Sequence, residues 1–105
     1  MAISTKQLLR ALSRLTGDPG KHRNENWAYR IKVRSSDGVE CAVTLSANGH
    51  RREPSLAALN DIADRIHIDR KRILNVLADW READLRRHLG TFTEAQLKPP
   101  TFRGR

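Results

Sequence analysis

The sequence predicts a single α+β domain, in which an N-terminal helix and a β-hairpin precede two paired helices and short C-terminal helices. Two periodicities predict this class. Apolar and polar residues alternate over residues 27–45, as in half-buried strands. In residues 4–16 and 55–80 apolar residues recur at steps of three and four, as in amphipathic helices. A chain of 105 residues has room for one modest core, so residues 1–97 are expected to form one domain.

The first helix is expected over residues 4–16. Ser4 and Gln7 have the spacing of a capping box, and Gly17 is placed to end the helix. One face of this helix is apolar, and a second face is basic. The apolar face carries Leu8, Ala11, Leu12 and Leu15, and the basic face carries Lys6, Arg10 and Arg14.

A two-stranded antiparallel β-hairpin is expected over residues 27–45. Opposed residues share a face of the sheet, so the loop length decides whether the two apolar sets coincide. A three-residue loop, Ser36-Asp37-Gly38, opposes Val33 with Cys41, whereas a two-residue turn would oppose Val33 with Ala42. We therefore predict a type I turn with Gly38 left-handed in a G1 bulge. The outer face of the hairpin then carries Arg30, Lys32 and Arg34.

Residues 55–80 are expected to form two helices joined by a turn of about four residues. Helical spacing holds up to Ile66, but the next step, to Ile68, is only two residues, which does not suit a continuous helix. Ser55 and Asp69 stand where the two helices need N-caps. The chain is therefore expected to bend near residue 67.

The pattern over residues 59–78 resembles the helix-turn-helix of DNA-binding regulators. Ala63 matches the small residue at which the second helix of that motif packs closest. His67 stands where the family usually has glycine, so His67 would need a positive φ. The apolar positions of the motif match Ile66, Ile68, Ile73 and Val76.

This resemblance implies that the second helix is a recognition helix, whose leading turn enters the major groove of DNA. Arginine and lysine there can bind guanine, and asparagine can bind adenine. The alternative is a helical hairpin that only builds core. The base contacts that the resemblance implies are Arg70, Lys71, Arg72 and Asn75.

The charge of the chain favours a polyanionic partner. Twenty Lys and Arg against twelve Asp and Glu give a net charge of +8 and a pI near 10.8. Residues 1–34 hold eight of these cations and two acids, a surplus of six that lies outside the helix-turn-helix. Phosphate contacts are expected from Lys6, Arg10, Arg30, Lys32, Arg34, Arg51 and Arg52.

An enzymatic alternative starts from His22, in a glycine-containing loop between the first helix and the first strand. This arrangement, over residues 4–66, resembles the HicA toxins, small RNA-cleaving proteins with a double-stranded-RNA-binding-like fold. The resemblance implies His22 as the catalytic residue, and Lys21 and Arg23 could steady a phosphate. The sequence departs from that family because it shows no third strand and has too many C-terminal helices.

These patterns together predict a non-enzymatic, cytoplasmic DNA-binding protein, either a transcriptional regulator or an accessory factor of a bacterial or phage mobile element. RNA is the alternative partner, and a homodimer is allowed. A third interpretation is a small basic protein that binds another protein, with Trp27 and Trp80 as anchors. No metal, cofactor or membrane partner is expected, because Cys41 is the only cysteine and no apolar run approaches 18 residues.

The C-terminal part leaves one question open. Residues 81–89 keep an apolar face, and either extend the recognition helix or form a separate helix. Thr93 and Gln96 have capping-box spacing, which predicts a short helical turn. Residues 98–105 are expected to be a mobile basic tail.

Overall fold

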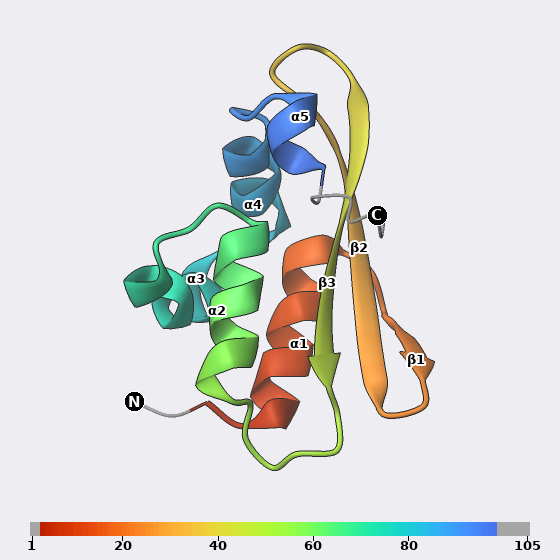
Figure 1. Ribbon diagram of the computed structural model, residues 1–105, viewed down its shortest axis with the longest axis vertical. Helices are drawn as coiled ribbons and strands as arrows, with labels where there is room; N and C mark the ends of the chain where they lie inside the picture. Colours follow the sequence, from red (N-terminus) through yellow and green to blue (C-terminus); the bar gives the residue numbers. More distant parts are fainter. Residues whose placement is uncertain (1–2, 99–105) are drawn as a thin grey trace, which may run out of the picture.

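The helices of this protein pack on one side of a three-stranded antiparallel sheet, in a computed structural model that describes residues 3–98 (Figure 1). The strand order is β1-β2-β3, so neighbours in sequence are neighbours in the sheet. In chain order the elements are α1 (Thr5–Thr16), β1 (Lys21–Arg23), β2 (Asn26–Arg34), β3 (Glu40–Asn48), α2 (Leu56–Arg65), the 3-10 turn η1 (Arg70–Arg72), α3 (Ile73–Asp79), α4 (Glu82–Leu89) and α5 (Glu94–Leu97).

The prediction of a two-stranded sheet is wrong, because β1 adds a third strand along the free edge of β2. His22 pairs with Trp27 across a turn in which Asn24 adopts a φ of 59°. All three residues of β1 are exposed. A strand without buried residues has no apolar alternation, so periodicity could not reveal it.

The register of the β2–β3 hairpin is confirmed. Val33 opposes Cys41 and Ile31 opposes Val43, as the three-residue loop requires. Gly38 is left-handed with a φ of 81°, and its N–H donates to the Ser35 carbonyl at 3.0 Å. The strands therefore bury one face and expose the other.

The capping box of α1 is also confirmed. The Gln7 N–H donates to Ser4 Oγ at 3.1 Å, and the Ser4 N–H donates to Gln7 Oε1 at 2.9 Å. Gly17 ends the helix with a φ of 73°. These caps fix the length of α1, whose apolar face packs against the sheet and the other helices.

The chain bends after α2, as predicted. This helix ends at Arg65, and His67 has a φ of 57°. Residues 81–89 do not extend α3, because Trp80 and Arg81 are in extended conformations (ψ 147° and 176°) and α4 starts anew at Glu82. The open question about residues 81–89 is thereby answered in favour of a separate helix.

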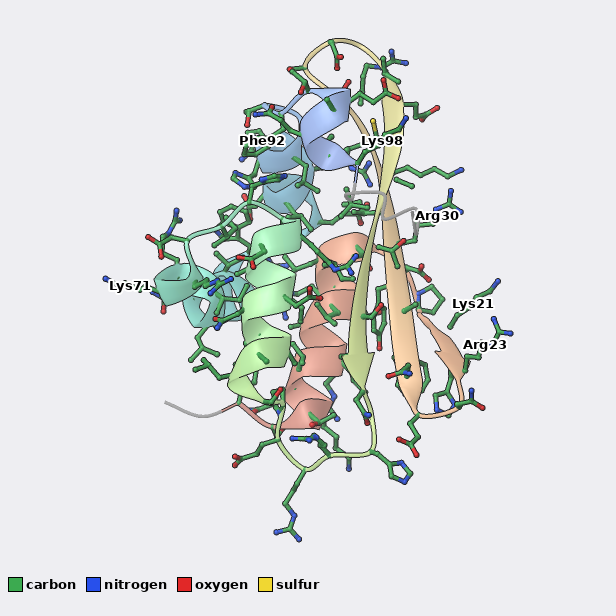
Figure 2. The ribbon with its side chains drawn as sticks, in the orientation of Figure 1. Lys21, Arg23, Arg30, Lys71, Phe92 and Lys98 are labelled. Atoms are coloured by element: carbon green, nitrogen blue, oxygen red, sulfur yellow. The ribbon has the colours of Figure 1, made fainter. Side chains whose placement is uncertain are left out.

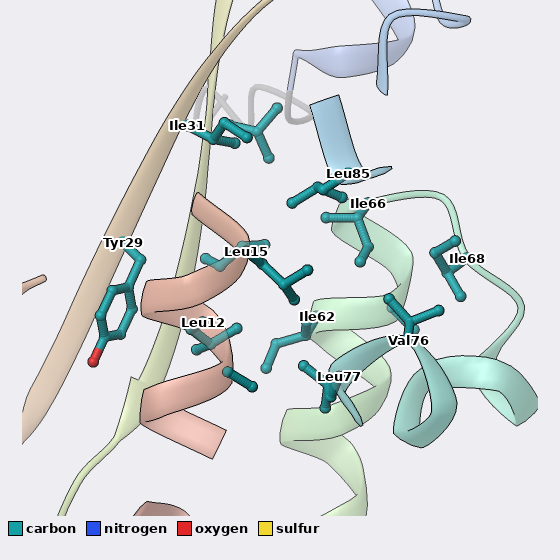
Figure 3. Close-up of a cluster of buried hydrophobic side chains, with 14 of the residues drawn as sticks. Leu12, Leu15, Tyr29, Ile31, Ile62, Ile66, Ile68, Val76, Leu77 and Leu85 are labelled. Atoms are coloured by element: carbon teal, nitrogen blue, oxygen red, sulfur yellow. The ribbon is translucent and has the colours of Figure 1, made fainter. Parts of the chain in front are cut away.

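The core lies where α1, α2, α3 and α4 converge over the inner face of the sheet (Figure 3). Tyr29 and Ile31 come from the sheet, and leucines and isoleucines come from the helices. Of the predicted basic tail, only Lys98 lies within the described residues. Over residues 3–98, no helix is both long enough and apolar enough to span a bilayer. Fully buried side chains include Leu8, Leu12, Leu15, Ile62, Ile66, Val76, Leu77, Leu85 and Leu89.

Candidate nucleic-acid interface

The second helix of the motif presents a polar edge, which we call the reading edge and define as Lys71, Arg72 and Asn75. All three side chains are exposed. Asp69 caps the preceding turn, since its carboxylate accepts the Lys71 N–H at 2.9 Å. Ile73 and Val76 hold the opposite face of the same segment in the core. The buried side chains of Ile73 and Val76 therefore fix the position of this segment, while the reading edge lies on its exposed face.

The bend that orients this edge is held by His67. Its ring stacks on Phe92 with centroids 4.5 Å apart, and its Nε2 lies 2.9 Å from the Gln96 carbonyl oxygen. Ala63 is fully buried below the turn, and its carbonyl accepts the Ile68 N–H at 2.9 Å. Contacts from the C-terminal segment thus stabilise a left-handed conformation that a non-glycine residue adopts at a cost.

Arg70, the first predicted base contact, is engaged by Asp64 of α2. Its Nε and Nη2 donate to the two carboxylate oxygens at 3.0 and 2.7 Å. The Arg70 guanidinium lowers the pKa of the Asp64 carboxyl group through these hydrogen bonds. Both side chains are more than half exposed, so water screens the pair and it is weak. Arg70 can therefore exchange Asp64 for another ligand.

Arg14 has a structural role that the sequence did not reveal. Its guanidinium donates to the carbonyl oxygens of Leu77 and of Trp80, the latter at 3.1 Å. These carbonyls lie at the C-terminal end of α3, where a helix has unpaired acceptors and a partial negative charge. Arg14 therefore fixes the C-terminal end of α3 to α1. The contact joins residues more than sixty positions apart, which no local pattern reports.

The other basic region is the outer face of the sheet, which we call the sheet surface. Its cations are all exposed, and no helix of residues 3–98 covers them (Figures 1 and 2). The predicted alternation of β2 places three of them there, and β1 adds two more beside them. The sheet surface comprises Lys21, Arg23, Arg30, Lys32 and Arg34.

No carboxylate among residues 3–98 forms an ion pair with a cation of the sheet surface. The nearby Asp18 carboxylate accepts the backbone N–H groups of Gly20 and Arg30 at 2.9 and 2.8 Å. These two hydrogen bonds, first from Gly20 and then from Arg30, lower the pKa of Asp18. The ion pairs that the structure does contain are Asp61–Arg65, Asp64–Arg70, Glu82–Arg86, Asp84–Arg87 and Glu94–Lys98.

The reading edge and the sheet surface lie on opposite sides of the molecule. Figure 2 shows Lys71 on the left, beyond the helices, and Lys21, Arg23 and Arg30 on the right, beyond the sheet. The view is down the shortest axis, so this separation is in the plane of the two longer dimensions, 39 and 37 Å. The structure thus does not bring the predicted base contacts together with the predicted phosphate contacts of β2.

The remaining predicted phosphate contacts are exposed but lie elsewhere. Lys6 and Arg10 are on α1, and Arg10 lines a shallow groove with Leu74 and Ala78 of α3. Arg10 is therefore close to α3. Arg51 and Arg52 are in the β3–α2 loop, which is tied to α1 because the Thr5 N–H donates to the Arg52 carbonyl at 2.9 Å.

His22 is the alternative catalytic residue, and it lies in the middle of β1. Its ring stacks on Trp27 with centroids 4.7 Å apart, and Trp27 stacks in turn on Tyr29. Because side chains alternate along a strand, Lys21 and Arg23 point to the other face. Within residues 3–98, no group of three His, Cys, Asp or Glu side chains is placed to hold a metal ion.

Comparisons with protein families, characterised proteins and solved structures find no match for this chain. The resemblances to helix-turn-helix regulators and to HicA toxins therefore remain predictions. The proposed base contacts, phosphate contacts and catalytic role of His22 likewise remain predictions.

Proposed function

We propose that this protein binds duplex DNA, with α2, η1 and α3 as a helix-turn-helix. The observation that carries the proposal is the bend at His67, which leaves the reading edge exposed. A continuous helix, or an edge packed under the sheet, would have removed the basis for this function. The role that follows is that of a transcriptional regulator or an accessory factor of a mobile element.

The chemistry of the reading edge supports this proposal. Lys71 and Arg72 carry the donors that suit guanine O6 and N7, and Asn75 carries the donor and acceptor that suit adenine. Arg10, beside α3, is placed to contact a flanking phosphate. Arg70 joins these contacts when it exchanges Asp64 for DNA. In the free protein the Asp64 carboxylate therefore offsets one positive charge beside the reading edge, and DNA binding restores that charge.

Selection from a random pool of duplexes tests this function. We expect the pool to converge on a preferred sequence at about 150 mM salt, where non-specific attraction is weak. The variant Lys71→Ala/Arg72→Ala should lose this preference, since each well-formed base contact is worth about 1–3 kcal/mol of discrimination.

The matched control for that selection is Arg87→Ala/Lys98→Ala, which removes the same charge from two exposed cations of other helices. It should keep the preference. A pool that never converges, or a preference that survives the Lys71/Arg72 change, would remove the helix-turn-helix function.

A second candidate, RNA cleavage through His22, gains support from the third strand. The order α1-β1-β2-β3-α2 is closer to the double-stranded-RNA-binding-like fold of HicA toxins than the two-stranded sheet expected from the sequence. This support is a fold-level analogy, which does not itself specify a reaction. His22 is exposed on β1 and is available to act as a base.

The test of this candidate is incubation of single-stranded and duplex RNA with the wild-type protein and with His22→Ala. Cleavage that disappears in the variant would support a ribonuclease. Equal cleavage by both proteins, or none by either, would contradict it. His50→Ala is the control, because His50 is another exposed histidine and lies in the β3–α2 loop.

A further inference from the structure

We propose that the sheet surface is a second nucleic-acid site, which binds the phosphate backbone of a duplex separate from the one at the reading edge. The protein would then bridge two DNA segments. The bridging rests on the proposed function of the reading edge, whereas the backbone site on the sheet stands without it.

The ion pairs of this protein lie away from the sheet surface. Each of the five ion pairs in residues 3–98 joins residues between 61 and 98. Residues 55–80 hold four cations and four carboxylates, a net charge of zero, whereas the three strands hold five cations and one carboxylate, Glu40, a net of +4. The sheet can therefore attract a polyanion independently of the segment that carries the reading edge.

The sheet surface presents its cations in a row along β2. In the sheet register, Lys32 lies opposite Ala42 and Arg30 lies opposite Thr44. The residues of β3 beside these two cations therefore have small side chains. Strand geometry spaces Arg30, Lys32 and Arg34 by roughly 6–7 Å each. Each DNA strand carries one phosphate per about 3.4 Å of helix axis, so the cations are spaced at about twice this distance. Their long, flexible side chains can therefore reach several phosphates of one strand. The ligand that fits a row of unpaired cations is a continuous phosphate backbone.

The sheet surface and the reading edge lie on opposite sides of the molecule. The sheet surface faces away from Lys71 (Figure 2), so a straight duplex seated against the reading edge runs past the helical side of the molecule. The cations of β2 cannot reach that duplex through the body of the protein. A second duplex against the sheet meets no such obstacle, because none of the helices in the described part of the chain covers this face (Figure 1).

The best positions for a test are Arg30 and Lys32. Arg34 is less suitable, because its Nη1 donates to the Gly38 carbonyl at 2.7 Å and it is paired in register with Glu40. The variant Arg30→Gln/Lys32→Gln keeps the polar outer face and leaves the core untouched. Arg81→Gln/Arg87→Gln changes the net charge equally at two exposed cations on the helical side and is the control.

The first measurement is the salt dependence of binding to a random-sequence duplex. Each lost phosphate contact should reduce the logarithmic salt slope by about 0.9, so two contacts reduce it by about 1.8. Between 50 and 200 mM salt the wild type should then lose about 12-fold more affinity than Arg30→Gln/Lys32→Gln. The control should keep the wild-type slope. Equal slopes for the two variants would overturn the sheet site.

The second measurement is capture of a labelled duplex by beads that carry another duplex. Wild type and control should capture it, and Arg30→Gln/Lys32→Gln should not. Capture that persists in this variant would assign bridging to a dimer and overturn the proposal. If Lys71→Gln/Arg72→Gln leaves all single-duplex binding intact but Arg30→Gln/Lys32→Gln abolishes it, the reading edge fails and the sheet site stands. Binding of the wild type to anionic phosphatidylserine vesicles but to no duplex would overturn the sheet site.

Discussion

At position 67 a histidine occupies a backbone conformation that side chains with a Cβ adopt at a cost of about 1–2 kcal/mol. The stacking on Phe92 and the polar contact to Gln96 offset this cost, since each type of contact contributes about 1 kcal/mol. The residue that bends the motif is thus held by the C-terminal segment. Local sequence predicted the bend but not the contacts that stabilise it.

Two substitutions at position 67 separate these contributions. His67→Gly removes the strain together with the contacts, so the free energy of unfolding should stay within about 1 kcal/mol of wild type. His67→Val removes the contacts and keeps the strain in a β-branched residue, which should cost about 2–3 kcal/mol. Urea denaturation measures both. Equal stability of the two variants would mean that φ at this position carries no cost.

Asp18 predicts a pH dependence of stability. Its folded pKa lies below the ordinary 3.8 because two backbone N–H groups donate to the carboxylate. The stability it contributes is therefore complete above that ordinary value and is lost as the pH falls through the lower folded pKa. Asp18→Asn should cost about 1 kcal/mol at pH 7, in the lower part of the usual range because the side chain is partly exposed.

The check is denaturation of wild type and Asp18→Asn between pH 7 and pH 2. The difference in unfolding free energy should shrink below about pH 4, as the wild-type carboxyl group becomes neutral. A difference that stays constant over the whole range would show that the charge of Asp18 does not contribute.

At the scale of elements, α3 depends on α1 for its C-terminal end. A seven-residue helix has few internal hydrogen bonds, so its unpaired carbonyls matter more than in a long helix. Arg14 supplies donors to two of these carbonyls. Since α3 carries Asn75 and supports Lys71 and Arg72, the cap links the first helix to the proposed function.

Substitution of Arg14 by alanine should lower the free energy of unfolding by about 1–2 kcal/mol and speed amide exchange at Trp80, whose N–H donates to the Val76 carbonyl. Arg10→Ala is the matched control, one turn away on the same helix with no hydrogen bond to α3. It should change stability by less than about 0.5 kcal/mol. Equal effects at both positions would contradict the capping role.

The elements that the sequence predicted are those with local determinants. The capping box of α1 and the β2–β3 register follow from spacing within a few residues, and both are present. β1 has only three exposed residues, and the break at Trp80 has neither glycine nor proline to mark it. The Arg14 cap arises from tertiary packing between residues more than sixty positions apart, which periodicity does not encode.

At the scale of the whole molecule, charge is divided between two sides. All five ion pairs of residues 3–98 lie on the helical side, whereas within these residues the cations of the sheet surface pair with no carboxylate. The sequence places a surplus of six cations in residues 1–34, but it does not show that the cations of β1 and β2 face away from the reading edge while Arg10 of α1 lies beside α3. Two surfaces of different character suit one sequence-dependent contact and one contact governed by salt.

The contact between the reading edge and DNA can be tested by titrating isotope-labelled protein with its selected duplex and following the backbone amide shifts at about 150 mM salt. At less than one equivalent of DNA, we expect the largest shifts between Asp69 and Leu77, and small shifts in β2. Shifts confined to the sheet, with residues 69–77 unchanged, would contradict the claim that the bend at His67 presents a DNA-reading edge.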